Sequence, residues 1–293
     1  MSGSVGKQIR LGRILRPDTA RTVCIGFDLA LVDGPAGGGV DLRSVMSELI
    51  AGAPDGILVS PGAARLLSDC YIGRDAPALL VRLDWTNEFR AELNHEQASS
   101  CLIAQVEDAV ALGADAVVTF LFLGYADSAA EADDIARNAA VSRACERLGV
   151  PHIVQAMAKG RRAKDRRLDP ALVQLAARIA AEIGADLVKA DYTGADSFAT
   201  VAAGCPVPIL VAGGPARDFD GTVQMAADAV AAGASGVVIG RNVLRAPQPA
   251  RLIQAIRSVV HDGLPADQAT PLTAPAQRSL ADKGTPLTAS AKR

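Results

Sequence analysis

The sequence predicts a single-domain α/β protein folded as a (β/α)8 barrel. Two features favour this class from the start. Hydrophobic residues make up 49% of the 293 residues while aromatics make up only 3%. That balance is typical of parallel strands buried on both faces beneath closely packed helices. The second feature is a regular alternation of helix and strand signals, which follows along the chain.

A Gly-Ala join between an amphipathic stretch and a short β-branched run recurs four times. The joining glycines are Gly52, Gly113, Gly184 and Gly233. Glycine readily takes the left-handed backbone conformation that ends a helix, and the residues after it turn into a strand. Each copy therefore predicts one α-to-β connection.

The apolar runs supply eight candidate strands, the number that closes a barrel. They span residues 23–27, 56–59, 78–83, 116–122, 152–156, 187–189, 209–212 and 236–239.

Helix signals lie between these runs. Asp169-Pro170 is a pattern typical of an N-cap followed by the first helical residue. Ser128 with Glu131 indicates a capping box that opens the helix before Gly149. An open doubly wound sheet is the rival fold, but Gly37-Gly38-Gly39 does not lead straight into a helix as its phosphate-binding turn would.

Composition also limits the domain plan and the function class. Residues 1–263 are expected to form the barrel, and residues 264–293, rich in Pro, Ala, Ser and Thr, a flexible tail. A formal charge of −2 gives no reason to expect a nucleic-acid partner. The polar N-terminus and the short apolar runs predict no membrane span and a cytoplasmic location. Five scattered cysteines without zinc spacing fit a reduced compartment and no metal.

Active-site residues of a barrel lie where its strands end, so that filter selects the candidates. His152 opens a strand and is expected on the opposite face, and His95 and His261 are expected in or near helices. The candidate positions at strand ends are Asp28, Ser60, Asp84, Met157, Lys159, Lys189, Gly213, Gly214, Gly240, Arg241 and Asn242.

Lys189 is the most informative of these positions. A lysine that closes a short apolar strand is costly to bury unless its charge is used or paired. Burial lowers an ammonium pKa and so frees the amine to attack a carbonyl. The alternative is a structural ion pair with Asp28 or Asp191. Spacing alone leaves both interpretations open.

Glycines end the seventh and eighth strands, where barrels commonly bind phosphate. Gly213 and Gly214 let the backbone approach an anion, as does Gly240, and Arg241 adds a charged contact. Ordinary loop chemistry is the alternative. The combination favours a phosphorylated small-molecule substrate.

With these residues in place, residues 6–263 resemble the archaeal-type class I fructose-bisphosphate aldolases, the aminodeoxyheptulosonate synthases and the thiolase that degrades phosphorylated autoinducer-2. The matching motifs are GKQIRLGRIL, Asp28 with Asp33-Gly34-Pro35, VKADYTG, GCPVPILVAGGP and GASGVVIGRNV.

This resemblance implies that Lys189 is the Schiff-base lysine and that Asp28 positions or protonates the substrate. It implies that Gly213, Gly214, Gly240 and Arg241 hold the phosphate of a ketose-phosphate-like substrate. It also implies a homo-oligomer, in relatives a ring of dimers or pentamers and so a decamer in some. Neither a cofactor nor a metal is expected.

The chain departs from the family pattern at two places: Leu29 follows Asp28 where relatives have a histidine, and Met157 replaces the acid/base tyrosine after the fifth strand. Methionine cannot transfer a proton. The candidate replacements are Tyr125, Asp84, Lys159 and Tyr192, and Trp85 is a candidate for shaping the pocket. Three functions remain: an aldolase or aldol-type synthase, a thiolase-like transferase acting on a phosphorylated dione, and a non-catalytic sugar-phosphate-binding protein.

Overall fold

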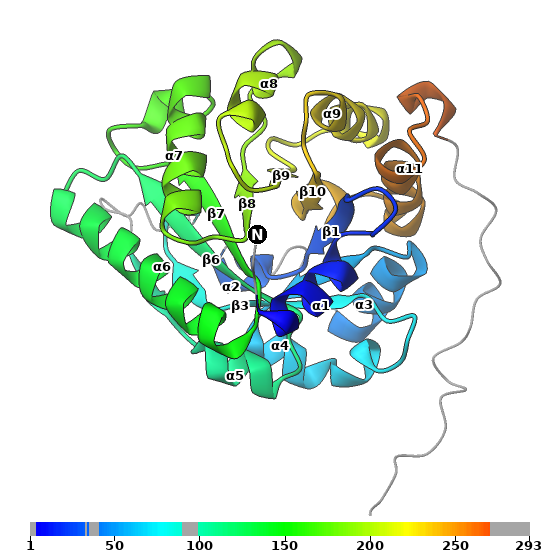
Figure 1. Ribbon diagram of the computed structural model, residues 1–293. Coiled ribbons are helices and arrows are strands. Elements are labelled where there is room, and N and C mark those ends of the chain that lie inside the picture. The colour runs from blue at the N-terminus through cyan, green and yellow to red at the C-terminus, as the bar shows by residue number, and fades with distance from the viewer. Residues whose placement is uncertain (1–3, 33, 35–40, 90–98, 270–293) are drawn as a thin grey trace, which may run out of the picture.

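The computed structural model describes residues 4–32, 34, 41–89 and 99–269, and these form one closed barrel of eight parallel strands (Figure 1). The predicted (β/α)8 fold is confirmed. Around the barrel the strands are β1 (Thr22–Gly26), β2 (Gly56–Val59), β3 (Ala78–Arg82), β6 (Ala116–Leu123), β7 (His152–Ala158), β8 (Leu187–Ala190), β9 (Ile209–Ala212) and β10 (Gly236–Ile239).

Helices follow the strands and form the outer ring. They are α2 (Leu29–Val32), α3 (Leu42–Ala51), α4 (Pro61–Leu66), α5 (Val106–Ala111), α6 (Ser128–Leu148), α7 (Pro170–Glu182), α8 (Ala195–Ala203), α9 (Phe219–Ala231), α10 (Arg241–Leu244) and α11 (Pro249–His261). Short 3-10 turns lie at η1 (Ser68–Tyr71), η3 (Lys164–Arg166) and η4 (Ala266–Gln268). None of the helices in the described ranges has the length and apolarity needed to cross a membrane.

The helix α1 (Val5–Ile14) precedes the barrel and closes its N-terminal end (Figure 1). Ile14 is fully buried and packs in one cluster with strand residues, among them Leu58, Ile153 and Leu187. Alternate residues of a strand point the same way. Lys189, two residues beyond Leu187, therefore faces the barrel interior nearer the other end.

Three of the four Gly-Ala joins are as expected. Gly113, Gly184 and Gly233 have φ of +83°, +101° and +100°. At the first join the prediction is wrong by one residue, because Ala53 takes the left-handed conformation with φ of +55°. Gly52 is needed for packing instead, since a Cβ there would lie 2.6 Å from the Cβ of Ile253 on α11.

The predicted capping box at the start of α6 is also corrected. Asp127 is the N-cap, and its carboxylate accepts from the amide of Ala129. Glu131 instead accepts from the amide of Gly124 at 2.7 Å and so ties the loop after β6 to the helix. At α7, Asp169 caps the helix and Pro170 begins it, as predicted.

Two features were not predicted. Directly after β3, the strand β4 (Asp84–Thr86) pairs antiparallel with β5 (Ser100–Leu102). Near the C-terminus, η4 contacts α9 and Ala269 is buried, so the folded part continues past the expected boundary at residue 263. The residues Asp33, Pro35, Gly37 to Gly39, His95 and 270–293 lie outside the described part.

Candidate active site

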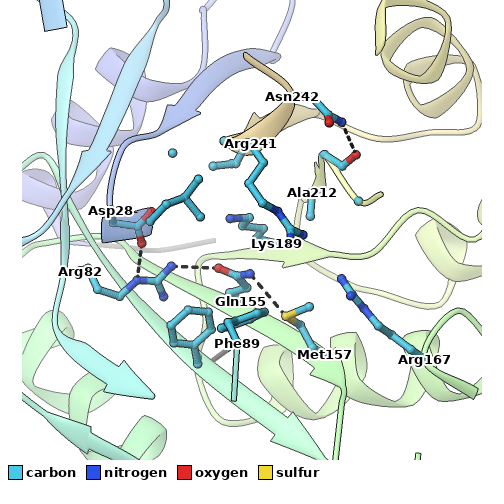
Figure 2. Close-up of a pocket in the computed structure, with 17 residues that line it drawn as sticks. Asp28, Arg82, Phe89, Gln155, Met157, Arg167, Lys189, Ala212, Arg241 and Asn242 are labelled. Atoms are coloured by element: carbon cyan, nitrogen blue, oxygen red, sulfur yellow. Dashed lines mark hydrogen bonds and ion pairs between the residues drawn. The ribbon is translucent and has the colours of Figure 1, made fainter. Parts of the chain in front are cut away.

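A cavity that is open to solvent lies at the C-terminal mouth of the barrel (Figure 2). Eight of the predicted strand-end residues line it: Asp28, Met157, Lys189, Gly213, Gly214, Gly240, Arg241 and Asn242. They come from the ends of β1, β7, β8, β9 and β10, which meet at one rim because the strands are parallel. Strand-end position was therefore a good guide to proximity.

Lys189 stands on β8 between Gln155 of β7 and Leu210 of β9 in the strand register. It is 8% exposed, and its ammonium group makes no hydrogen bond or ion pair with any residue in the described ranges. Burial is the main cause that lowers the pKa of its amine from 10.5 to about 8. At pH 8 about half of such amines are neutral and nucleophilic.

The ion pairs that could have neutralised Lys189 are made elsewhere. Asp28 accepts from Nε of Arg82 at 2.8 Å, and the two side chains are almost fully buried. Asp191 accepts two hydrogen bonds from Arg167, at 3.0 and 2.7 Å. Because both expected partners are held by arginines, the alternative of a structural Lys–Asp pair loses its support.

The β9 and β10 side of the cavity is built from backbone and one cation. Gly214 has φ of +64°, and a Cβ on Gly213 would lie 3.0 Å from Ile239. Asn242 holds the loop by donating to the carbonyls of Gly213 and Pro215, each at 3.0 Å. Arg241 begins α10 and points toward Lys189 in Figure 2. An oxyanion fits this side.

The opposite wall of the cavity carries three apolar side chains, Phe120 from β6, Met157 from β7 and Phe89 from the loop after β4. Phe89 and Phe120 lie 5.4 Å apart between ring centroids, and Met157 is 3% exposed beside them. The Met157 sulfur accepts a hydrogen bond from Gln155 Nε2 at 3.4 Å. No tyrosine is among the residues that line the cavity in the described part of the chain.

Six other candidates lie outside the cavity lining. Ser60 is the N-cap of α4, and its hydroxyl accepts from the amide of Ala63. The Tyr125 hydroxyl donates to Asp134 at 3.2 Å, and burial raises the pKa of this phenol. Asp84 is fully buried behind Arg82, and burial raises its pKa to about 6. The Lys159 ammonium binds Glu88, at 2.7 Å from its carbonyl and 3.0 Å from its carboxylate. Trp85 is half-buried in β4, and Tyr192 packs on Phe198 with ring centroids 5.4 Å apart.

Several lining residues were missed from the sequence. Arg82 and Gln155 share the inward face of their strands with Lys189, so strand alternation was a usable signal for both. Phe120 follows the same rule on β6. Phe89 and Arg167 come from irregular segments, where no periodicity predicts direction.

Comparison with known proteins places the chain in a family. Residues 22–246 match the model of the DeoC/LacD family aldolases. The 2-amino-4,5-dihydroxy-6-oxo-7-(phosphonooxy)heptanoate synthase of Streptomyces griseus is 34% identical over 259 residues, covering 87% of this chain and 90% of that protein. The 3-hydroxy-5-phosphonooxypentane-2,4-dione thiolase of Escherichia coli is 32% identical over 264 residues, covering 90% and 85%.

A solved archaeal fructose 1,6-bisphosphate aldolase is also similar, with a TM-score of 0.75 at 25% identity, covering 87% of this chain and 99% of that one. The resemblance inferred from the motifs is thus confirmed. The chain belongs to the DeoC/LacD family of class I aldolases.

Proposed function

We propose that Lys189 attacks the carbonyl of a phosphorylated ketone and that the protein then makes or cleaves the neighbouring carbon–carbon bond. The observation that carries this proposal is the state of one amine. Lys189 is buried, faces an open cavity, and has no ionic partner in the described part of the chain. A buried amine with a lowered pKa is the form that adds to carbonyls.

The chemistry follows from that addition. The neutral amine adds to the carbonyl carbon, and loss of water leaves a protonated imine. A base then takes the proton of the hydroxyl on Cβ, the bond between Cα and Cβ breaks, and Cβ leaves as an aldehyde. The electron pair of that bond forms the enamine double bond as the imine nitrogen accepts the π electrons of the C=N bond. Protonation of the enamine and hydrolysis return Lys189. Asp28 is the only carboxylate among the described lining residues and is the group we assign to proton transfer.

The glycine side of the cavity supports a phosphorylated substrate. Gly213, Gly214 and Gly240 present backbone to the cavity, where N–H groups can bind a phosphate, and Arg241 supplies a charge-assisted contact. Because Lys189 and these glycines line the same cavity, we infer a ketone phosphate of the dihydroxyacetone phosphate type as the substrate. Asp84, Trp85, Tyr125 and Lys159 have no part in this proposal.

Imine trapping tests the assignment. Borohydride reduction in the presence of dihydroxyacetone phosphate is expected to add the mass of the reduced ketone adduct to the peptide that contains Lys189. Lys189→Met should abolish the adduct, while Lys159→Met, which removes an amine bound to Glu88 outside the cavity lining, should retain it. Repeated absence of an adduct on folded protein would remove Lys189 from the mechanism.

Met157 and its apolar surroundings favour a second candidate, transfer of an acyl group to a thiol. In that reaction the carbon–carbon bond of a phosphorylated dione breaks, its acyl carbon bonds to the thiol sulfur, and the thiol proton passes to the enamine carbon. Because the thiol supplies the proton, this reaction needs no tyrosine as acid or base. Formation of a thioester from coenzyme A, without release of an aldehyde, would distinguish this function from the aldolase. A homo-oligomer and a cytoplasmic location remain predictions. Light scattering, which measures the mass of the particle in solution, tests the first.

A further inference from the structure

Arg82 is an arginine buried inside the barrel. It occupies the inward face of β3 and is 1% exposed. A buried guanidinium is costly unless every side of it is occupied by matching groups. Its surroundings therefore indicate what the charge is for.

The guanidinium is fixed on three sides. Nε donates to Asp28 at 2.8 Å, and Nη2 donates to Gln155 Oε1 at 2.9 Å (Figure 2). Its central carbon lies 3.8 Å from the centroid of the Phe120 ring. Nη1 is 3.6 Å from Asp84 Oδ1, and neither atom has a hydrogen bond in the described part of the structure. One planar group thus holds a carboxylate and an amide in fixed directions.

A chain of alternating charges supports Arg82 from behind. Asp84 lies 3.3 Å from Arg137, which lies 2.5 Å from Asp134 on α6. Arg137 also donates to the carbonyl of Phe120 at 2.9 Å. The positive charge of Arg82 is therefore flanked by two carboxylates, one in the cavity and one behind it.

We propose that Arg82 is a positioning residue for Lys189: it holds the Asp28 carboxylate in an arginine pair and so leaves the neighbouring amine without a counter-ion. This inference rests on the proposed function of Lys189, because it explains how that amine stays neutral beside a carboxylate. Gln155 completes the arrangement, since it links Arg82 to Met157 along one wall.

The electrostatic surroundings of Lys189 give the direction of the effect. After burial, the charge of Asp28 raises the pKa of the amine and the charge of Arg82 lowers it, with weaker contributions from Asp191 and Cys24 that raise it. Arg167 and Arg241 line the same cavity. Removal of Arg82 takes away one opposing cation and also frees Asp28 to approach the ammonium. Both changes favour the charged amine.

The test measures the amine itself. The pH dependence of Lys189 acetylation by a small reagent, followed by mass spectrometry of its peptide, reports the amine pKa without any ketone. Arg82→Met is expected to raise the midpoint by about one pH unit or more. Arg82→Lys keeps the positive charge but cannot hold Asp28 and Gln155 together. Its midpoint should therefore lie between those of the wild type and Arg82→Met. Arg178→Gln, on the exposed face of α7, is the matched control and should match the wild type.

A double variant separates positioning from simple damage. In Arg82→Met/Asp28→Asn the freed carboxylate is absent, so the midpoint should return toward the wild-type value. An unchanged midpoint in folded Arg82→Met, or a double variant as high as the single one, would overturn the proposal. If Arg82→Met does not fold, Arg82→Lys and Asp28→Asn test the proposal instead. Arg82→Lys should raise the midpoint of Lys189 acetylation and Asp28→Asn should lower it. The reverse result would overturn the proposal. Because the readout needs no substrate, failure to trap an imine would count against the proposed function alone.

Discussion

Replacing Lys189 by methionine should make the protein more stable at neutral pH. Burial lowers the pKa of this amine from 10.5 to about 8, so the folded state opposes its protonation while the unfolded state does not. Below pH 8 the full cost is present, and it disappears as pH rises through 10.5. A shift of about 2.5 units corresponds to about 3 kcal/mol. Methionine fills a similar volume without that cost.

The assay is urea unfolding of the wild type and Lys189→Met at pH 7 and pH 9.5. The variant should be more stable at pH 7 by up to about 3 kcal/mol, and the gap should shrink by about 2 kcal/mol at pH 9.5, since about 1.4 kcal/mol is recovered per pH unit above 8. A gap that does not change with pH, or a wild type more stable at pH 7, would refute the reasoning.

Lys7 is the matched control, because its pKa moves in the opposite direction. It is 3% exposed, and burial alone would lower its pKa, but hydrogen bonds to Glu146 and Asp186 raise it overall. Its contribution is therefore stabilising below pH 10.5 and is lost only as pH rises through the higher folded value. Lys7→Met should lower stability equally at pH 7 and pH 9.5. Equal behaviour of the two lysine variants would contradict both assignments.

Three further predictions concern the phosphate side, the loops and acid stability. Arg241→Gln should raise KM for a phosphorylated ketone by about 10- to 100-fold, the loss of one charge-assisted contact, and leave an unphosphorylated analogue unaffected in steady-state assays. Gly160→Ala would place a Cβ 2.3 Å from the carbonyl oxygen of Gly124, so its free energy of unfolding in urea should fall by at least about 2 kcal/mol. The control is Gly62→Ala, where a Cβ meets no atom within 4 Å in a helix, and this variant should be as stable as the wild type or more stable. Burial lowers the pKa of His152 to about 3. As pH falls below 6.5, this residue should therefore reduce the free energy of unfolding by about 1.4 kcal/mol per pH unit. His152→Gln should make that pH dependence less steep in acid titrations.

The barrel was predictable because its signals are local and repeated. Each Gly-Ala join and each β-branched run indicates one step of the same alternation, so errors of a residue, as at Ala53, do not disturb the whole. Lys189 was predictable for a similar reason, since a charge that ends an apolar strand is conspicuous in one dimension. The hairpin of β4 and β5 was not, because its three-residue strands are too short for periodicity and their partners are separated along the chain.

Side-chain partners were harder to predict than positions. The sequence left open an ion pair of Lys189 with Asp28 or Asp191, and only the fold shows that Arg82 and Arg167 hold these carboxylates. Tyr125 follows β6 at the correct rim, yet its hydroxyl turns to Asp134 on α6. These hydrogen-bond partners come from elements that are distant in the sequence, so residue spacing within one element does not predict them.

The N-terminal helix has a practical consequence for handling the protein. Because α1 lies across the end of the barrel remote from Lys189, a fusion partner or surface linker attached ahead of Ser4 would stand away from the substrate entrance. Deleting that helix would expose the N-terminal end of the barrel interior, with Leu58, Ile153 and Leu187, to water. Immobilised preparations should therefore be anchored by an intact N-terminus.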